Sequence, residues 1–252
     1  MEPEILLPVS DPVLVAELDA LAKRHRAAGG IGMTVLTYVG GSAEGLLAKL
    51  PQGVRDGLEG ATERALHTAF DAAARSRGAV SDRADWVNTA IATAMGVAGG
   101  AGGLPGALAE LPFTVTMLLR AIQGIAAEHG FDPASDEMRM ECLRVFASAG
   151  PLAKDDGADM AFVGARMTIT GASVNSLIAR VAPRLSAVLG QKLAAQAAPV
   201  LGAVAGAAVN YSFTSYYQEI ARVHFGLKRL ARDSAADEGL LREELVARIA
   251  KR

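Results

Sequence analysis

The sequence predicts an all-α fold: a single multi-helix domain with glycine-rich, apolar helical hairpins. Apolar residues recur at helical spacing along most of the chain, and no segment keeps the alternation of a β-strand. Hydrophobic residues make up 51% of the 252 positions and aromatic residues only 5%, so the apolar mass is aliphatic and mostly small. Such side chains let helices approach closely but bury little area each, so the predicted core must be extensive.

Helix boundaries follow from prolines, glycines and the apolar rhythm. We expect a first helix at 11–28, because Pro12 suits its first turn and Gly29 and Gly30 would end it. Gly130 is expected to be the C-cap of a later helix. The clearest amphipathic segment is 54–75, and further helices are expected at about 107–129, 135–149 and 235–251. The predicted organisation is a tail at 1–10, a helical domain at 11–232 and a charged C-terminal helix at 233–252.

Two apolar segments are rich in glycine. Residues 86–109 form an uncharged run that is long enough to span a membrane. Its glycines and Pro105 instead predict two helices joined by a hinge. Pairs of glycines four residues apart permit close helix crossing, either in a soluble core or within lipid. The glycines expected to pack closely are Gly99, Gly103, Gly202 and Gly206.

The segment between Asp159 and Glu219 contains no acidic residue, yet it contains four basic ones. Basic side chains near anionic lipid head groups contribute about 1 kcal/mol each. We therefore expect contact with membrane or lipid from Arg166, Arg180, Arg184 and Lys192.

Motifs of nucleotide, metal and thiol chemistry are missing or incomplete. The glycines that begin at Gly30 and at Gly100 lack the spacing of a dinucleotide fingerprint, and Gly190-Gln191-Lys192 lacks the glycine spacing of a P-loop. Asp155, Asp156 and Asp159 form a DDxxD pattern that can gather Mg²⁺, but Gly157 predicts a solvated loop. The lone Cys142 excludes an internal disulfide and a cysteine-based zinc cluster. We expect no metal and no cofactor, and a net charge of −2 gives no indication of nucleic-acid binding.

Three polar residues recur every seven positions near the C-terminus. Asn210, Tyr217 and His224 would lie roughly on one helix face. That face is either a polar seam towards solvent or a neighbouring helix, or one wall of a binding groove. The N-terminal residues lack the basic and apolar regions of a secretory signal, so we expect a cytoplasmic location.

Three stretches together resemble the EcsC protein family. They are ADWVNTAIATAMGVAGGAGGLPG, LPFTVTMLLRAIQGIAAEHGFDP and APVLGAVAGAAVNYSFTSYYQEIARVHF, and the likeness extends over roughly 14–230. The resemblance implies a bacterial helical protein, and the founding member of the family is encoded beside an ABC exporter linked to protein secretion. It implies no catalytic residues, because the family has no established activity.

Three classes of function fit these patterns. The leading expectation is a non-enzymatic protein that associates peripherally with the cytoplasmic face of the inner membrane, holds lipid between its helices and supports an ABC transporter or secretion. The alternatives are a soluble helical scaffold for a membrane complex, and a helical hydrolase or lipid-modifying enzyme. Co-sedimentation with anionic vesicles distinguishes a membrane-associated protein from a soluble scaffold. An enzyme would require a buried polar cluster.

Overall fold

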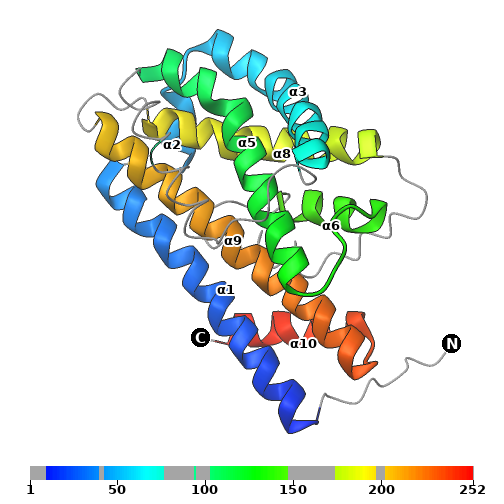
Figure 1. Cartoon of the computed structure of the whole chain (residues 1–252). Helices are drawn as coiled ribbons and strands as arrows, with labels where there is room; N and C mark the ends of the chain where they lie inside the picture. Colours follow the sequence, from blue (N-terminus) through cyan, green and yellow to red (C-terminus); the bar gives the residue numbers. More distant parts are fainter. Residues whose placement is uncertain are drawn as a thin grey trace, which may run out of the picture.

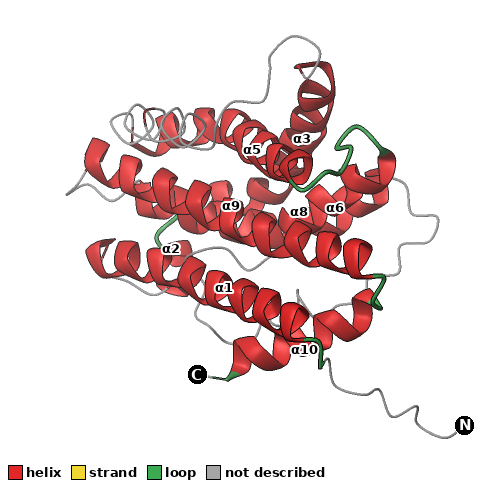
Figure 2. Cartoon of the chain, turned by 60° about the horizontal axis from the view of Figure 1, so that its bottom comes forward, coloured by secondary structure: helices red, strands yellow, loops and turns green. Residues whose placement is uncertain are grey.

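A computed structural model describes residues 10–39, 43–76, 94, 103–146, 174–196 and 202–251. Within these ranges the chain is helical and contains no strand, which confirms the all-α prediction (Figures 1 and 2). The helices are α1 (Pro12–Val39), α2 (Ala43–Ala48), α3 (Gln52–Ser76), α5 (Gly103–Glu128), α6 (Asp136–Phe146), α8 (Val174–Gln196), α9 (Gly202–Ser234) and α10 (Glu238–Ala250).

Helix α9 is the centre of the fold. It contacts α1, α5, α6, α8 and α10, and it crosses the molecule between α1 and α5 in Figure 1. Its buried residues include Val209, Phe213, Tyr216, Tyr217 and Ile220, whose helical spacing places them on one side of the helix. They join the apolar faces of α3, α5, α6 and α8 in the main hydrophobic core.

A second apolar cluster attaches the C-terminal helix to the rest. Leu241, Leu245 and Ile249 on α10 are buried against the α1 and α9 residues Leu18, Leu21, Ala22, Val223, Leu227 and Leu230. The side chain of Asp237 caps α10 by accepting a hydrogen bond from the backbone N–H of Leu240 at 2.8 Å. The charged terminal helix therefore buries one face rather than lying free.

Two glycine predictions have opposite outcomes. Gly130 has φ +77° and ends α5, and its N–H and that of Phe131 donate to the carbonyls of Ala127 and Ala126, which confirms the predicted C-cap. The predicted stop at Gly29–Gly30 is wrong, because α1 continues to Val39. Glycine costs a helix interior only about 1 kcal/mol relative to alanine, and contacts between α1 and α9 offset that cost.

The four glycines expected to pack closely are not all described. Gly99 lies outside the described residues. Gly103 begins α5, and Gly202 and Gly206 lie in the first turns of α9, but their surroundings are outside the described part. Close packing is instead seen at Gly190 in α8, where an added Cβ would lie 2.6 Å from Leu47 Cδ2 and 2.8 Å from Leu58 Cδ2.

We expect Gly190→Leu to lower the free energy of unfolding. Overpacking a filled core costs about 1–3 kcal/mol, and here it must exceed the gain of about 1 kcal/mol in helix propensity. Urea unfolding followed by circular dichroism measures the change. Gly124→Ala on α5 is the matched control, because an added Cβ there meets nothing within 4 Å, and it should stabilise the protein slightly. If Gly190→Leu is as stable as the wild type, then Leu47 on α2 and Leu58 on α3 can move aside at little energetic cost.

Candidate functional site

A lysine and a glutamate form an ion pair in the interior, where α5, α8 and α9 meet. Lys192 Nζ on α8 lies 3.0 Å from Glu110 Oε1 on α5, and their side chains are 0% and 2% exposed. Burying two opposite charges is tolerated only when they pair well and further hydrogen bonds satisfy them. The pair therefore imposes a specific arrangement on the three helices.

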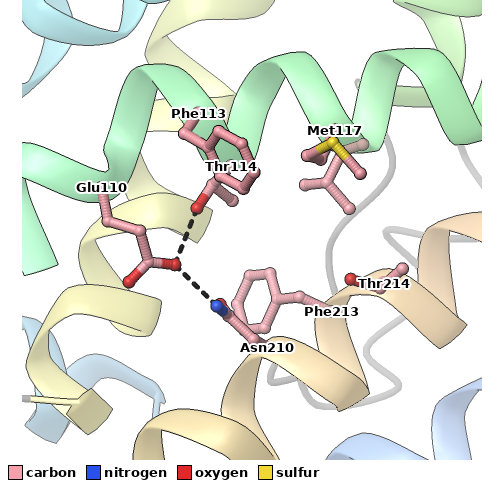
Figure 3. Close-up of a pocket in the computed structure, with 8 residues that line it drawn as sticks. Glu110, Phe113, Thr114, Met117, Asn210, Phe213 and Thr214 are labelled. Atoms are coloured by element: carbon pink, nitrogen blue, oxygen red, sulfur yellow. Dashed lines mark hydrogen bonds between the residues drawn. The ribbon is translucent and has the colours of Figure 1, made fainter. Parts of the chain in front are cut away.

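Two neutral side chains complete the polar centre. Glu110 Oε1 also accepts hydrogen bonds from Thr114 Oγ1 at 3.0 Å and from Asn210 Nδ2 at 2.6 Å (Figure 3). Lys192 Nζ donates a second bond to Thr114 Oγ1 at 2.9 Å. Glu110 and Thr114 are one helical turn apart on α5, so they present both groups to α8 and α9. We call Glu110, Thr114, Lys192 and Asn210 the polar centre.

The electrostatics of the polar centre are balanced internally. Burial lowers the pKa of Lys192, and the adjacent Glu110 carboxylate opposes that effect. The distance of 3.0 Å between Lys192 Nζ and Glu110 Oε1 is within hydrogen-bond range. The polar centre thus has polar groups but little net charge.

A narrow pocket opens beside the polar centre, between α5 and α9 (Figure 3). Its empty volume is about 240 Å³ including the part open to solvent, and only about 10 Å³ admits the centre of a water molecule, which is room for about one water. The pocket is lined by Glu110, Phe113, Thr114, Met117, Leu118, Asn210, Phe213 and Thr214. Polar and apolar side chains are interleaved in its lining.

A second charged cluster joins α6, α9 and α10. Glu141 on α6 is the hub: His224 Nε2 lies 2.8 Å from its Oε2, and Arg144 and Lys228 contact its Oε1 at 2.6 and 3.4 Å. Lys228 also reaches Glu238 on α10 at 3.3 Å. Burial by itself would raise the pKa of Glu141, but the hydrogen bond from His224 and the three neighbouring cations outweigh it and lower the pKa to about 2.

The basic residues predicted to contact lipid differ in their burial. Arg180 is exposed and Arg184 is half-buried on the outer side of α8, whereas Arg166 lies outside the described residues. The assignment of Lys192 to the surface is wrong. Its pairing acid, Glu110, is distant in sequence, so the acid-free segment around Lys192 gave no indication of a partner.

The polar seam of α9 faces inward. Asn210 belongs to the polar centre, Tyr217 is buried with its ring 5.5 Å from that of Phe146, and His224 belongs to the Glu141 cluster. They share a face, as their spacing predicts, but they do not form one site, because an interval of seven residues separates them by about 10 Å along a helix. Asn210 alone among them lines the pocket.

Sequence reasoning missed Glu110 and Thr114. Glu110 follows the uncharged run 86–109, and Lys192 immediately precedes the uncharged run 193–218. A single acid and a single base at the edges of apolar helices are candidates for a buried pair, and that signal was available. Thr114 gave no signal of its own beyond lying one turn from Glu110.

Metal and membrane signals are limited in the described part of the chain. No group of three or more His, Cys, Asp or Glu side chains there could hold a metal ion. One helix segment, Leu108–Glu128, is long and apolar enough to cross a membrane, although 56% of it is buried inside the fold. Core helices of soluble proteins share that property, so the segment by itself indicates neither location.

The described helices form an all-α bundle with a central helix, a buried polar centre and a narrow pocket lined by polar and apolar side chains. The chain belongs to the EcsC protein family, whose family model matches residues 44–230. This confirms the predicted resemblance. Comparisons with curated proteins and with solved structures gave no significant match.

Proposed function

We propose that this EcsC-family protein is non-enzymatic and docks reversibly on an anionic membrane surface through the outer face of α8. The observation that supports the proposal is the composition of that face. The face has one exposed basic residue, Arg180, and one half-buried basic residue, Arg184. The other exposed residues beside them are small: Ala179, Pro183 and Ala187. Helix α8 contains no acidic residue. Within the described part of the chain, no carboxylate pairs with Arg180.

The expected strength of docking follows from the charges that remain at the surface. Because Lys192 is buried, the exposed Arg180 is the main contributor, with about 1 kcal/mol near anionic lipid, and the half-buried Arg184 lies one turn away on the same face. Binding of this size is reversible and weakens as salt rises. The small exposed side chains of Ala179, Pro183 and Ala187 beside the two arginines let the helix approach the head groups closely. Such docking would place the protein where it could support a membrane transporter, and the founding member of the family is encoded beside an ABC exporter.

We expect the double variant Arg180→Glu/Arg184→Glu to bind anionic vesicles at least about tenfold more weakly than the wild type, since two attractions become repulsions. Co-sedimentation with vesicles of phosphatidylglycerol and phosphatidylcholine, at low and at high salt, measures the change. Circular dichroism should show unchanged helicity.

Arg55→Glu on α3 is the matched control, because Arg55 is also exposed but lies among the acids Asp56 and Glu59. It should sediment like the wild type. If the double variant sediments as well as the wild type, α8 is not the docking face. If the wild type stays in the supernatant at low salt, membrane docking is wrong and the soluble scaffold replaces it.

A further inference from the structure

The turn between α9 and α10 contains a residue in an unfavourable backbone conformation. In the part of the chain that the structure describes, Ala235 is the one non-glycine residue with a positive φ, and its value is +54°. This left-handed conformation brings the Cβ atom close to the following carbonyl oxygen, so glycine is the usual residue just after the end of a helix. The turn is therefore strained at Ala235, and glycine would relieve that strain.

The local sequence favours a different conformation of the same residues. Alanine has the highest helix propensity, and the segment 231–238, which includes Ala235 and Ala236, contains no proline or glycine. Local preference alone would join α9 and α10 into one continuous helix. The turn is held instead by Ser234 Oγ, which accepts a hydrogen bond from the backbone N–H of Ala236 at 3.3 Å, and by the Asp237 cap of α10. The turn and the continuous helix therefore compete at this point of the chain.

Helix α10 packs as a unit on α1 and α9 (Figures 1 and 2). Its buried residues Leu241, Leu245 and Ile249 belong to an apolar cluster that shares no residue with the main core. We call the α1 and α9 part of that cluster the α10-binding face: Leu18, Leu21, Ala22, Val223, Leu227 and Leu230. If the turn straightened, α10 would leave this face and expose apolar surface on both sides. A single open chain is therefore unfavourable by itself.

Charged contacts make the α10-binding face specific for α10. Arg248 Nε on α10 lies 3.0 Å from Asp19 Oδ1 on α1, and Arg26 on α1 donates to the backbone carbonyl of Arg248 at 2.9 Å. At the other end of α10, Glu238 Oε2 lies 3.3 Å from Lys228 Nζ on α9. The segment that matches this face in apolar spacing and in charge is α10 itself, from the same chain or from a second copy.

We propose that two copies of this chain form a dimer by exchanging α10. In each chain the turn at 235–236 becomes helical, and α10 occupies the α10-binding face of the other copy. The contacts of α10 with α1 and α9 are then retained between the chains, and the strain at Ala235 is released twice. The lost turn contacts and the lost translational freedom oppose the exchange, so the dimer fraction rises with protein concentration.

The test is the mass of the full chain, measured by light scattering after gel filtration from low to high micromolar protein. Samples are first equilibrated in moderate urea and returned to buffer, so that α10 can leave its own chain. We expect a monomer at low concentration and a dimer at high concentration.

Ala235→Gly should lower the association constant of the dimer, because glycine accepts the positive φ of the monomer. Ala236→Gly is the matched control: it weakens the continuous helix equally, but φ at Ala236 is not positive, so no strain is relieved. The decrease with Ala235→Gly should exceed the decrease with Ala236→Gly at least about tenfold, since each dimer contains two turns.

A short flexible linker of glycine and serine, inserted between Ala235 and Ala236, should keep the protein monomeric at every concentration. The longer connection lets α10 fold back on its own chain without strain.

Three results would overturn the proposal: a wild type that stays monomeric throughout, a dimer that survives the insertion, or equal effects of Ala235→Gly and Ala236→Gly. A dimer that survives the insertion would form through another face. The Arg180→Glu/Arg184→Glu variant should dimerise like the wild type, which keeps this test distinct from that of membrane docking.

Discussion

Replacing Lys192 with methionine is expected to lower the free energy of unfolding by about 3–5 kcal/mol. The substitution keeps the length and apolar volume of the side chain but leaves the Glu110 carboxylate buried without its cation. Thr114 and Asn210 still donate to that carboxylate, but neither carries a charge. Urea unfolding at pH 7 measures the loss, which is large relative to the usual total stability of a protein domain.

Two further variants show whether the loss comes from the unpaired charge. Arg180→Met removes a basic residue from the exposed face of the same helix and should change stability by no more than about 0.5 kcal/mol. The double variant Lys192→Met/Glu110→Leu removes both charges and should recover much of the lost stability, since apolar replacements of a buried pair are often neutral. A Lys192→Met variant within 1 kcal/mol of the wild type would mean that Lys192 is not buried against Glu110 in solution.

Acidification is expected to remove about 3 kcal/mol of stability through Glu141. Its folded-state pKa of about 2 lies below its ordinary value of 4.5, and one pKa unit corresponds to about 1.4 kcal/mol. Because the folded pKa is lowered, this contribution is fully present above about pH 5 and is lost as the pH falls towards 2. Urea unfolding at a series of pH values from 7 to 2 measures it.

The variant Glu141→Gln should remove this contribution. It should be less stable than the wild type by about 3 kcal/mol at pH 7, and its stability should fall correspondingly less between pH 5 and pH 2. Glu59→Gln, on the exposed face of α3, should retain the wild-type pH dependence. If Glu141→Gln and the wild type lose stability in parallel on acidification, the contacts of Glu141 with His224 and Lys228 do not stabilise the folded state.

Much of the fold was predictable from local patterns. The rhythm of apolar residues in 54–75 and the glycine after His129 are properties of a few neighbouring residues, and both predictions agree with α3 and the end of α5. Gly29–Gly30 shows the limit of such reasoning. A local cost of about 1 kcal/mol per glycine is small beside the packing of a whole helix, so the neighbouring α9 decides whether α1 continues.

The helical class, the family and an acid-free segment with several basic residues can all be recognised from the amino-acid sequence alone. Which of those basic residues reach the surface depends on how the helices pack. Lys192 and Arg180 look alike in sequence, but twelve positions along α8 place one against Glu110 in the core and leave the other at the surface. Charge pairing over 82 residues depends on how α5, α8 and α9 pack, and no local pattern specifies that packing.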